Sequence, residues 1–275
     1  MWALVAVALA TMAAPVSGTA ETVSATERPE PAAALRPPIN RPWLRYQTIG
    51  LMGAFDGEVA HLASLVTSPR RVIIAQKEFT IGRLAGHRVV VVLSGVGLIN
   101  AAHTTQILID RFGVDTVFFT GSAAPLVPDI GVLDSVISTE TQQFTMDFRP
   151  LFPLGEVPFL RTSVFPSDPD LVELATRVAA TIPGGTTVAG KILSGDRLAP
   201  AAGTEVLLQG IAVESEGAAV GQVCNLNGVP YVVIRTMSNT LADPNEFEKY
   251  QAQAALRSQQ IALKMLQSIR RPSRW

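Results

Sequence analysis

Polar side chains that could carry chemistry stand in short segments that each follow an apolar run. Glu58 lies in GAFDGEV, after the run TIGLMG, and Ser122 lies in FTGSAAP, after VDTVF. Glu214 and Glu216 belong to AVESE, and Asn239 ends RTMSN. A carboxylate such as that of Glu58 can deprotonate water, which is the chemistry of hydrolysis. These segments are therefore the first candidates for a functional site.

The elements that must position these residues are strands and helices in alternation. Strands are predicted at 48–53, 114–121, 186–195, 211–215 and 229–238, with β-rich runs at 71–79, 80–85, 87–95 and 132–138. Helices are predicted from about 54 through Ser68 and at 97–113, 168–182, 216–228 and 245–268. The alternation indicates a single three-layer αβα domain with a mixed, largely parallel central sheet. In such sheets ligands bind at the carboxyl ends of the strands, where the polar segments fall.

The charge balance argues against a nucleic-acid-binding protein, and the amino terminus indicates an exported one. The 275 residues contain 22 Lys and Arg against 23 Asp and Glu, which argues against a nucleic-acid surface. Residues 1–20 contain 15 apolar residues and no charged side chain, and predict a signal peptide and export to the periplasm or medium. The alternative is a misassigned start codon before a cytoplasmic protein. A Pro-rich linker is predicted at 21–44, a folded domain at 45–275, and no membrane attachment once the signal is removed.

Several motifs, in the order and spacing of a known family, carry a family resemblance. They are SGVG (94–97), TGSA (120–123), SGD (194–196), AVESE (212–216) and RTMSN (235–239). Together they resemble the nucleoside phosphorylase/nucleosidase superfamily, closest to the 5′-methylthioadenosine/S-adenosylhomocysteine nucleosidases, from about Thr48 to Leu266. The resemblance implies a nucleoside phosphorylase-like fold, a small purine nucleoside as ligand, no metal or organic cofactor, and a homodimer whose neighbouring subunit contributes to the pocket.

The resemblance also implies roles for individual residues. Glu58 matches the glutamate that activates water, and Ser122 matches the serine near that water. Glu216 matches the acid that binds the ribose hydroxyls. Ser215 replaces the methionine that usually separates the two acids, which weakens the apolar packing beneath the sugar.

The residues expected around the base depart further from the family. Leu198 and Ala199 occupy the positions that hold the base, and Leu198 stands where the family has an aromatic ring. Ser238 and Asn239 replace Ser-Asp, whose aspartic acid protonates or hydrogen-bonds N7 of adenine. The amide of Asn239 cannot release a proton, but it keeps a donor and an acceptor, which favours a 6-oxopurine over adenine.

Two phenylalanines are further candidates for the pocket wall. Phe148 belongs to a loop that borders the pocket in the family, although core packing is equally consistent with its sequence. Phe247 begins the final predicted helix, from where it would close the pocket.

Structural roles compete with these functional ones. Arg235 and Glu214 suit a buried ion pair, and Asp196 suits either a loop cap or a brace for Asn239. The three histidines are scattered, and Cys224 is the single cysteine, so no metal-ligand spacing is present.

Hydrolysis is favoured over phosphorolysis because GAFDGEV contains acids rather than an arginine, and because Phe119 and Thr120, not an arginine, precede Gly121. A nucleoside-binding protein with decayed catalysis, or a phosphorylase with rearranged phosphate ligands, remain the alternatives.

Overall fold

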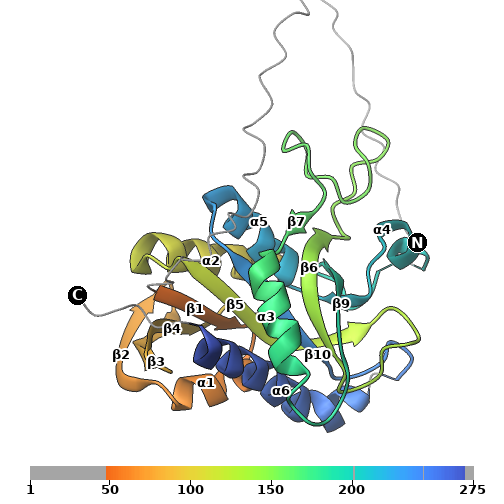
Figure 1. Cartoon of the computed structure of the whole chain (residues 1–275). Coiled ribbons are helices and arrows are strands. Elements are labelled where there is room, and N and C mark those ends of the chain that lie inside the picture. Colours follow the sequence, from red (N-terminus) through yellow and green to blue (C-terminus); the bar gives the residue numbers. More distant parts are fainter. Residues whose placement is uncertain (1–47, 201, 244, 270–275) are drawn as a thin grey trace, which may run out of the picture. The chain divides into compact units, whose positions relative to one another are not determined.

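A computed structural model describes residues 48–200, 202–243 and 245–269 (Figure 1). The predicted signal peptide, the predicted linker and the first residues of the predicted domain lie outside the described residues. No helix among the described residues combines the length and apolarity needed to cross a bilayer.

The described chain alternates strands with helices, as the sequence predicts. The strands are β1 (Thr48–Gly53), β2 (Thr67–Ile74), β3 (Lys77–Leu84), β4 (His87–Leu93), β5 (Thr116–Pro125), β6 (Ser135–Gln143), β7 (Phe165–Pro166), β8 (Thr187–Ser194), β9 (Ala212–Glu214) and β10 (Tyr231–Met237). The helices are η1 (Asp56–Glu58, a 3-10 turn), α1 (Ala60–Ser64), α2 (Leu98–Phe112), α3 (Pro169–Ala179), α4 (Thr204–Leu208), α5 (Gly217–Asn227) and α6 (Glu246–Ser268).

The sheet is mixed, with parallel strands at its centre. β1 lies between β4 and β5, parallel to both, and β10 is parallel to β5 on the other side. β3 and β2 continue the sheet antiparallel beyond β4. β5 also pairs with β9, and the run β9–β8–β6–β10 returns to β5, so these strands close into a ring. Carboxyl ends of β1, β5 and β10 therefore lie side by side.

Helices cover both faces of this sheet, which confirms the three-layer prediction. α1, α3 and α6 share one apolar core with alternate residues of β1 and β4, such as Ile49, Leu51, Val89 and Val91. The intervening residues of the same strands pack with α2 and α5 in a second core. Figure 1 shows α3 and α6 in front of the sheet, with α2 on its far side. Strands buried on both faces explain the near-continuous apolar runs in the sequence.

Two predicted boundaries are wrong, and two short elements were not predicted. The helix expected through Ser68 ends at Ser64, because Pro69 disfavours helical backbone at the residue before it, and Ser68 has a φ of 52° within β2. β5 continues past Gly121 to Pro125, because it pairs with β10 on one side and β9 on the other. Ser122 therefore lies within a strand rather than after one. The short elements β7 and α4 were not predicted.

Candidate active site

Glu58 is the most deeply buried of the predicted catalytic residues, with 1% of its surface exposed. The turn η1 directly follows β1 and returns the side chain toward the sheet. Its Oε2 accepts a hydrogen bond from the N–H of Ala54 at 2.7 Å, and its Oε1 accepts from the N–H of Ser122 at 2.8 Å and from the Ser122 hydroxyl at 3.2 Å. The residue that follows β1 and a residue within β5 thus hold one carboxylate in place.

Burial controls the protonation of this carboxyl group. It raises the pKa of Glu58 above its usual range, while the nearby Arg235 guanidinium and the N–H groups of Ala54 and Ser122 act in the opposite direction. A carboxylate with a raised pKa is a stronger base than an exposed one, so it is better suited to accept a proton from water.

Gly121 permits the close approach of these groups. A Cβ atom at this position would lie 2.6 Å from Glu58 Oε1 and would collide with the Arg235 guanidinium. β5 therefore needs a residue without a side chain at the point where Glu58 contacts Ser122. The sequence supplies glycine at this one point between two larger residues.

Arg235 is fully buried on β10 and forms the ion pair expected with Glu214. Its Nη2 donates to Glu214 Oε2, and also to Glu216 Oε2 at 3.3 Å, while its Nη1 donates to the carbonyl oxygen of Thr120 at 2.9 Å. The guanidinium lies 4.1 Å from the ring centroid of Phe119. Arg235 thus connects Glu214, the last residue of β9, and Glu216, just after it, with the strand that carries Ser122.

Glu214 is occupied by structural contacts. Its carboxylate accepts hydrogen bonds from the Ser194 hydroxyl and from the N–H groups of Glu216 and Gly217, at the start of α5. A helix start with free N–H groups favours a negative charge. The structure therefore gives Glu214 the structural role weighed from the sequence.

Glu216 belongs to the same cluster but has a different environment. Its Oε1 accepts from the N–H of Gly97 at 2.9 Å, and Gly97 has a φ of 98°, a conformation that favours glycine. Burial first, and then the charge of Glu214, raise the pKa of Glu216 to about 8, while Arg235 acts to lower it. The site contains three acids and one arginine, and this arginine is already paired with Glu214 and Glu216.

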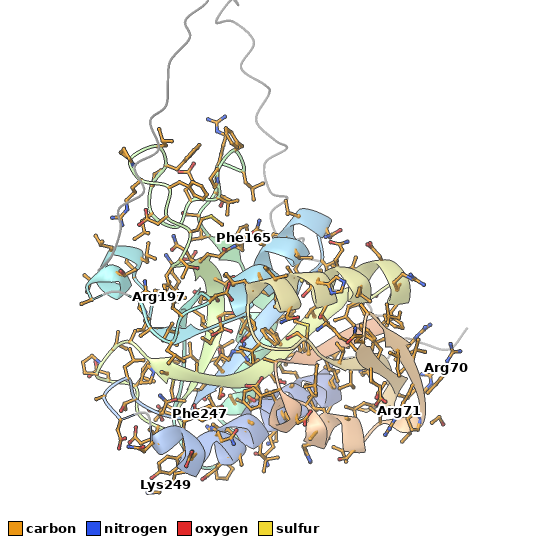
Figure 2. The ribbon with its side chains drawn as sticks, turned by 180° about the vertical axis from the view of Figure 1, so that it is seen from behind. Arg70, Arg71, Phe165, Arg197, Phe247 and Lys249 are labelled. Carbon is orange, nitrogen blue, oxygen red and sulfur yellow. The ribbon has the colours of Figure 1, made fainter. Side chains whose placement is uncertain are left out.

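Asp196 braces a loop rather than Asn239. Its Oδ1 accepts from the N–H of Leu98 at 2.9 Å, at the first residue of α2. Together with the bond between Gly97 and Glu216, this contact joins the SGVG segment to the segments that follow β8 and β9. Arg197, beside Asp196, marks the position of this loop in Figure 2.

Asn239 and Ser238 follow β10, next to the end of β5. The N–H of Ser238 donates to the carbonyl oxygen of Ala123 at 3.0 Å, one residue after Ser122. Asn239 is half-buried; its Oδ1 accepts from the Ser238 hydroxyl at 3.0 Å and its Nδ2 donates to the Thr240 carbonyl oxygen at 2.9 Å. One N–H of the amide and one lone pair of its oxygen remain for a ligand.

The other predicted binding residues lie farther out. Ser215 is half-buried between the two acids, and Ala199 is half-buried on the loop after β8. Leu198, on the same loop, is 95% exposed, and Phe148 is half exposed on the loop after β6. The structure thus brings Glu58, Ser122, Glu216, Ser238 and Asn239 together at the strand ends, and leaves Leu198 and Phe148 at the surface.

Phe247 lies in the first turn of α6 and is labelled in Figure 2. Its ring meets the ring of Phe55 edge to face, with 6.3 Å between centroids. Phe55 is the residue between Ala54 and η1, so this pair covers the segment that holds Glu58. The sequence reasoning missed Phe55, although it stands in the same motif as Glu58.

The backbone N–H groups of Ala54 and Gly97 were also missed, because a main-chain donor leaves no trace in residue type. Among the described residues no group of three or more His, Cys, Asp or Glu side chains is arranged to hold a metal ion. The cluster therefore combines two buried carboxyl groups, those of Glu58 and Glu216, whose pKa values are both raised, with the amide of Asn239.

Known proteins are similar to this chain in sequence and in fold. A family model for the phosphorylase superfamily matches residues 48–267. A 5′-methylthioadenosine/S-adenosylhomocysteine nucleosidase of Geobacillus thermodenitrificans is 37% identical over 224 residues, which cover 78% of this chain and 94% of that protein. The crystal structure of such a nucleosidase from Colwellia psychrerythraea in complex with adenine superposes with a TM-score of 0.76 at 34% identity, covering 82% of this chain and 98% of that one.

A third similar structure contains an asparagine in place of an aspartate. A mutant of the Helicobacter pylori nucleosidase, with one aspartate replaced by asparagine, was crystallised with 5′-methylthioadenosine in its active site. It superposes with a TM-score of 0.75 at 28% identity, covering 81% of this chain and 99% of that one.

Proposed function

Because this chain belongs to the phosphorylase superfamily, we infer that the site at the ends of β1, β5 and β10 is the active site of a purine nucleosidase. The enzyme hydrolyses the N-glycosidic bond of methylthioadenosine, adenosylhomocysteine or a related nucleoside. The observation that carries this function is the buried Glu58 carboxylate, held by Ala54 and Ser122 beside Glu216. Relatives with the same fold are named for this reaction.

In the proposed mechanism Glu58 accepts a proton from water as the water approaches the anomeric carbon. The ribosyl group develops positive charge as the bond to the base breaks, and the carboxylate of Glu58 stabilises that charge. Ser122 keeps Glu58 in position through its N–H and hydroxyl groups.

Glu216 binds the ribose hydroxyls and fixes the sugar relative to Glu58, a role of orientation rather than proton transfer. It is itself positioned by Gly97 and Arg235. Asn239 and Ser238 hydrogen-bond the departing base. Ser215, Ala199, Leu198, Phe148 and Phe247 complete the binding surface in this proposal.

Charge supports hydrolysis over phosphorolysis. A phosphorylase has to bind phosphate, which needs cations and free N–H groups. Arg235 is the buried cation of this cluster, and it is committed to Glu214, Glu216 and Thr120. The N–H groups of Ala54 and Ser122 are occupied by Glu58.

The test is a panel of purine nucleosides, incubated with the pure protein with and without phosphate, with the release of base followed over time. Release that does not depend on phosphate is the expected result. Release that requires phosphate would show a phosphorylase instead, and no release at high enzyme concentration would refute the enzymatic function.

A nucleoside-binding protein with decayed catalysis is the second candidate. Asn239 supports it, because its amide lacks a proton to give, and the Helicobacter pylori mutant shows that this fold retains 5′-methylthioadenosine with an asparagine in place of an aspartate. Tight binding in calorimetry without turnover would favour this candidate.

We propose a homodimer as the assembly. The SGVG segment, the first turn of α2 and the loop after β6 expose large apolar side chains, among them Val96, Ile99, Leu151 and Phe159. Exposed apolar surface favours association. Light scattering after size-exclusion chromatography tests this; a monomer at micromolar concentration would refute it.

Export is proposed on the apolar, uncharged residues 1–20. N-terminal sequencing of the protein recovered from the periplasm of a bacterial host tests it. A cleaved chain that begins near Glu21 is expected, and an uncleaved protein found in the cytoplasm would refute it.

A further inference from the structure

A buried glutamine of α6 contacts the turn that carries Glu58. Gln259 is 1% exposed, on a helix that packs against both η1 and α1 (Figure 1). Its Nε2 donates to the carbonyl oxygen of Gly57 at 2.7 Å. Its Oε1 accepts from the N–H of His61 at 2.9 Å and from the N–H of Leu62 at 3.3 Å. One side chain thus holds the backbone on both sides of Glu58.

The amide of Gln259 uses its full hydrogen-bonding capacity within the protein. The second N–H of its Nε2 donates to the carbonyl oxygen of Ala255 at 3.0 Å, one turn earlier in α6. A side-chain amide has two N–H donors and an oxygen with two lone pairs, so every donor and lone pair is matched. Turning the amide over would place its N–H groups against two N–H donors of the backbone. Because unmatched buried polar groups are costly, the amide has one stable orientation.

The two peptide groups that flank the Cα atom of Glu58 are both held by side chains. The preceding one includes the carbonyl of Gly57, which Gln259 binds. The following one includes the carbonyl of Glu58 itself, whose oxygen accepts from the Thr120 hydroxyl at 2.7 Å. Peptide groups are planar, so their two orientations set the direction of the side chain between them. Gln259 and Thr120 therefore direct the Glu58 carboxyl group toward Ser122.

The start of α1 depends on the same glutamine. Val59 precedes this helix and makes no capping hydrogen bond, since its side chain has no acceptor. The first N–H groups of a helix have no partner within it, and those of His61 and Leu62 are bound by Gln259 instead. Capping α1 is a structural role, and a test has to separate it from an effect on Glu58.

We propose that Gln259 is a positioning residue for Glu58: from α6 it fixes the turn η1 in the conformation that keeps the carboxyl group buried and directed at Ser122. The inference rests on the proposed function, in which Glu58 accepts the proton from water. Because the amide of Gln259 is fully used within the protein, it acts through Glu58 and not on the nucleoside.

The experiment measures base release from methylthioadenosine and inosine over a range of pH, and calorimetric binding of both, in the full-length protein. Gln259→Met removes all four hydrogen bonds and keeps the length of the side chain. Gln259→Asn keeps an amide but is shorter, and is the milder variant if the first does not fold. Arg257→Met is the matched control, because Arg257 is also buried on α6 and also donates to backbone carbonyl oxygens, those of Ile182, Pro183 and Gly185 before β8.

The expected effect is on kcat. Gln259→Met should lower kcat about 10- to 100-fold, since displacing a catalytic group by about 1 Å has an effect of this size. The dissociation constant of the nucleoside should stay within about threefold of wild type, because the affected step is bond cleavage. Gln259→Asn should lower kcat less, by about 3- to 10-fold. Arg257→Met should also lower the thermal midpoint, but it should keep kcat within about threefold.

The pH profile provides a readout that a purely structural role would not change. A base has to be ionised to act, so kcat/KM rises with pH through the pKa of Glu58. Burial is the largest cause of the raised pKa of Glu58, and a looser turn would expose the carboxyl group. Gln259→Met should therefore move the acidic limb of the profile to lower pH. Arg235 and Glu216, the charged groups that also interact with Glu58, are kept in every variant, and Arg257→Met should leave the limb in place.

A folded Gln259→Met protein with kcat within about threefold of wild type and an unchanged acidic limb would overturn the proposal, because Gln259 would then only cap α1. Equal losses of kcat in Arg257→Met would overturn it as well, since they would show an effect of stability alone.

Failure of the proposed function is a distinct result. If wild type releases no base, NMR titration of carbon-13-labelled glutamate carboxyl groups still reports the pKa of Glu58, and Glu58→Gln identifies its signal. A lower pKa of Glu58 in Gln259→Met, and not in Arg257→Met, would then support the positioning role without the nucleosidase. An unchanged pKa of Glu58 in Gln259→Met would refute that role.

Discussion

Asn239 is the residue at which a single substitution should change the chemistry most. Asn239→Asp restores a group that can give a proton to N7 of adenine. General acid catalysis contributes about 10²–10⁴-fold, which corresponds to about 3–5 kcal/mol of the barrier. We expect a gain of at least about 100-fold in kcat on adenine nucleosides, with little change on 6-oxopurine nucleosides.

The surroundings of Asn239 indicate that the new acid would hold its proton. Its Nδ2 lies 2.9 Å from the Thr240 carbonyl oxygen, which accepts a hydrogen bond from a protonated carboxyl group but repels an ionised one. Glu246, whose Oε2 accepts from the Thr240 N–H at 2.8 Å, adds negative charge nearby. Both effects raise the pKa of an aspartic acid at this position, and the Ser238 hydroxyl only partly opposes them.

The assay is the release of adenine from methylthioadenosine over a range of pH, compared with the release of hypoxanthine from inosine. Because the acid must be protonated to act, the gain in Asn239→Asp should shrink as the pH rises through the pKa of the new group. Asn227→Asp, at the exposed end of α5, makes the same substitution away from the site and is the control. A folded Asn239→Asp protein that binds the nucleoside but gains less than about fivefold would refute the reasoning.

Three further predictions test the rest of the site. Glu58→Gln should lower kcat by about 10²–10⁴-fold while calorimetry still shows nucleoside binding, and retained turnover would exclude Glu58 as the base. The pKa of Glu216 is raised to about 8 from 4.5, so the folded protein holds a proton that the unfolded chain has lost. Its share of the free energy of unfolding is therefore fully present below about pH 4.5 and is lost as the pH rises to about 8, by at most about 1.4 kcal/mol per pH unit. In urea unfolding, the free energy of unfolding of Glu216→Gln should decrease less steeply with pH over this range than that of wild type. An identical slope for the two proteins would contradict the assignment. Gly121→Ala should destabilise the fold by about 1–3 kcal/mol and displace Glu58, whereas Gly131→Ala, where a Cβ would lie 3.6 Å from its nearest neighbour, should keep both stability and activity in thermal melts and base-release assays.

The fold followed from the sequence because its strands are buried on both faces. Such strands are uniformly apolar, and this pattern identified β1, β5 and β10 without any knowledge of their neighbours. Errors arose where pairing decided the outcome. β5 extends to Pro125 because β9 and β10 flank it, and neither partner is visible in the local pattern.

The sequence by itself determined the class of fold and the residue types of the site. Glu58, Ser122, Glu216 and Asn239 each stand in a recognisable motif. Glu58 and Asn239 follow the parallel strands β1 and β10, as the sequence predicts, whereas Ser122 lies within β5 and Glu216 follows β9, which is antiparallel to β5.

Only the tertiary structure decided how these residues act on one another. It placed the Gly97 N–H on Glu216, 119 residues away, and buried Arg235 beneath Gly121 between two acids. It also assigned Asp196 to the start of α2 rather than to Asn239. Local sequence encodes periodicity and turn chemistry, whereas burial, and the protonation that depends on it, arise from the approach of segments far apart in the chain.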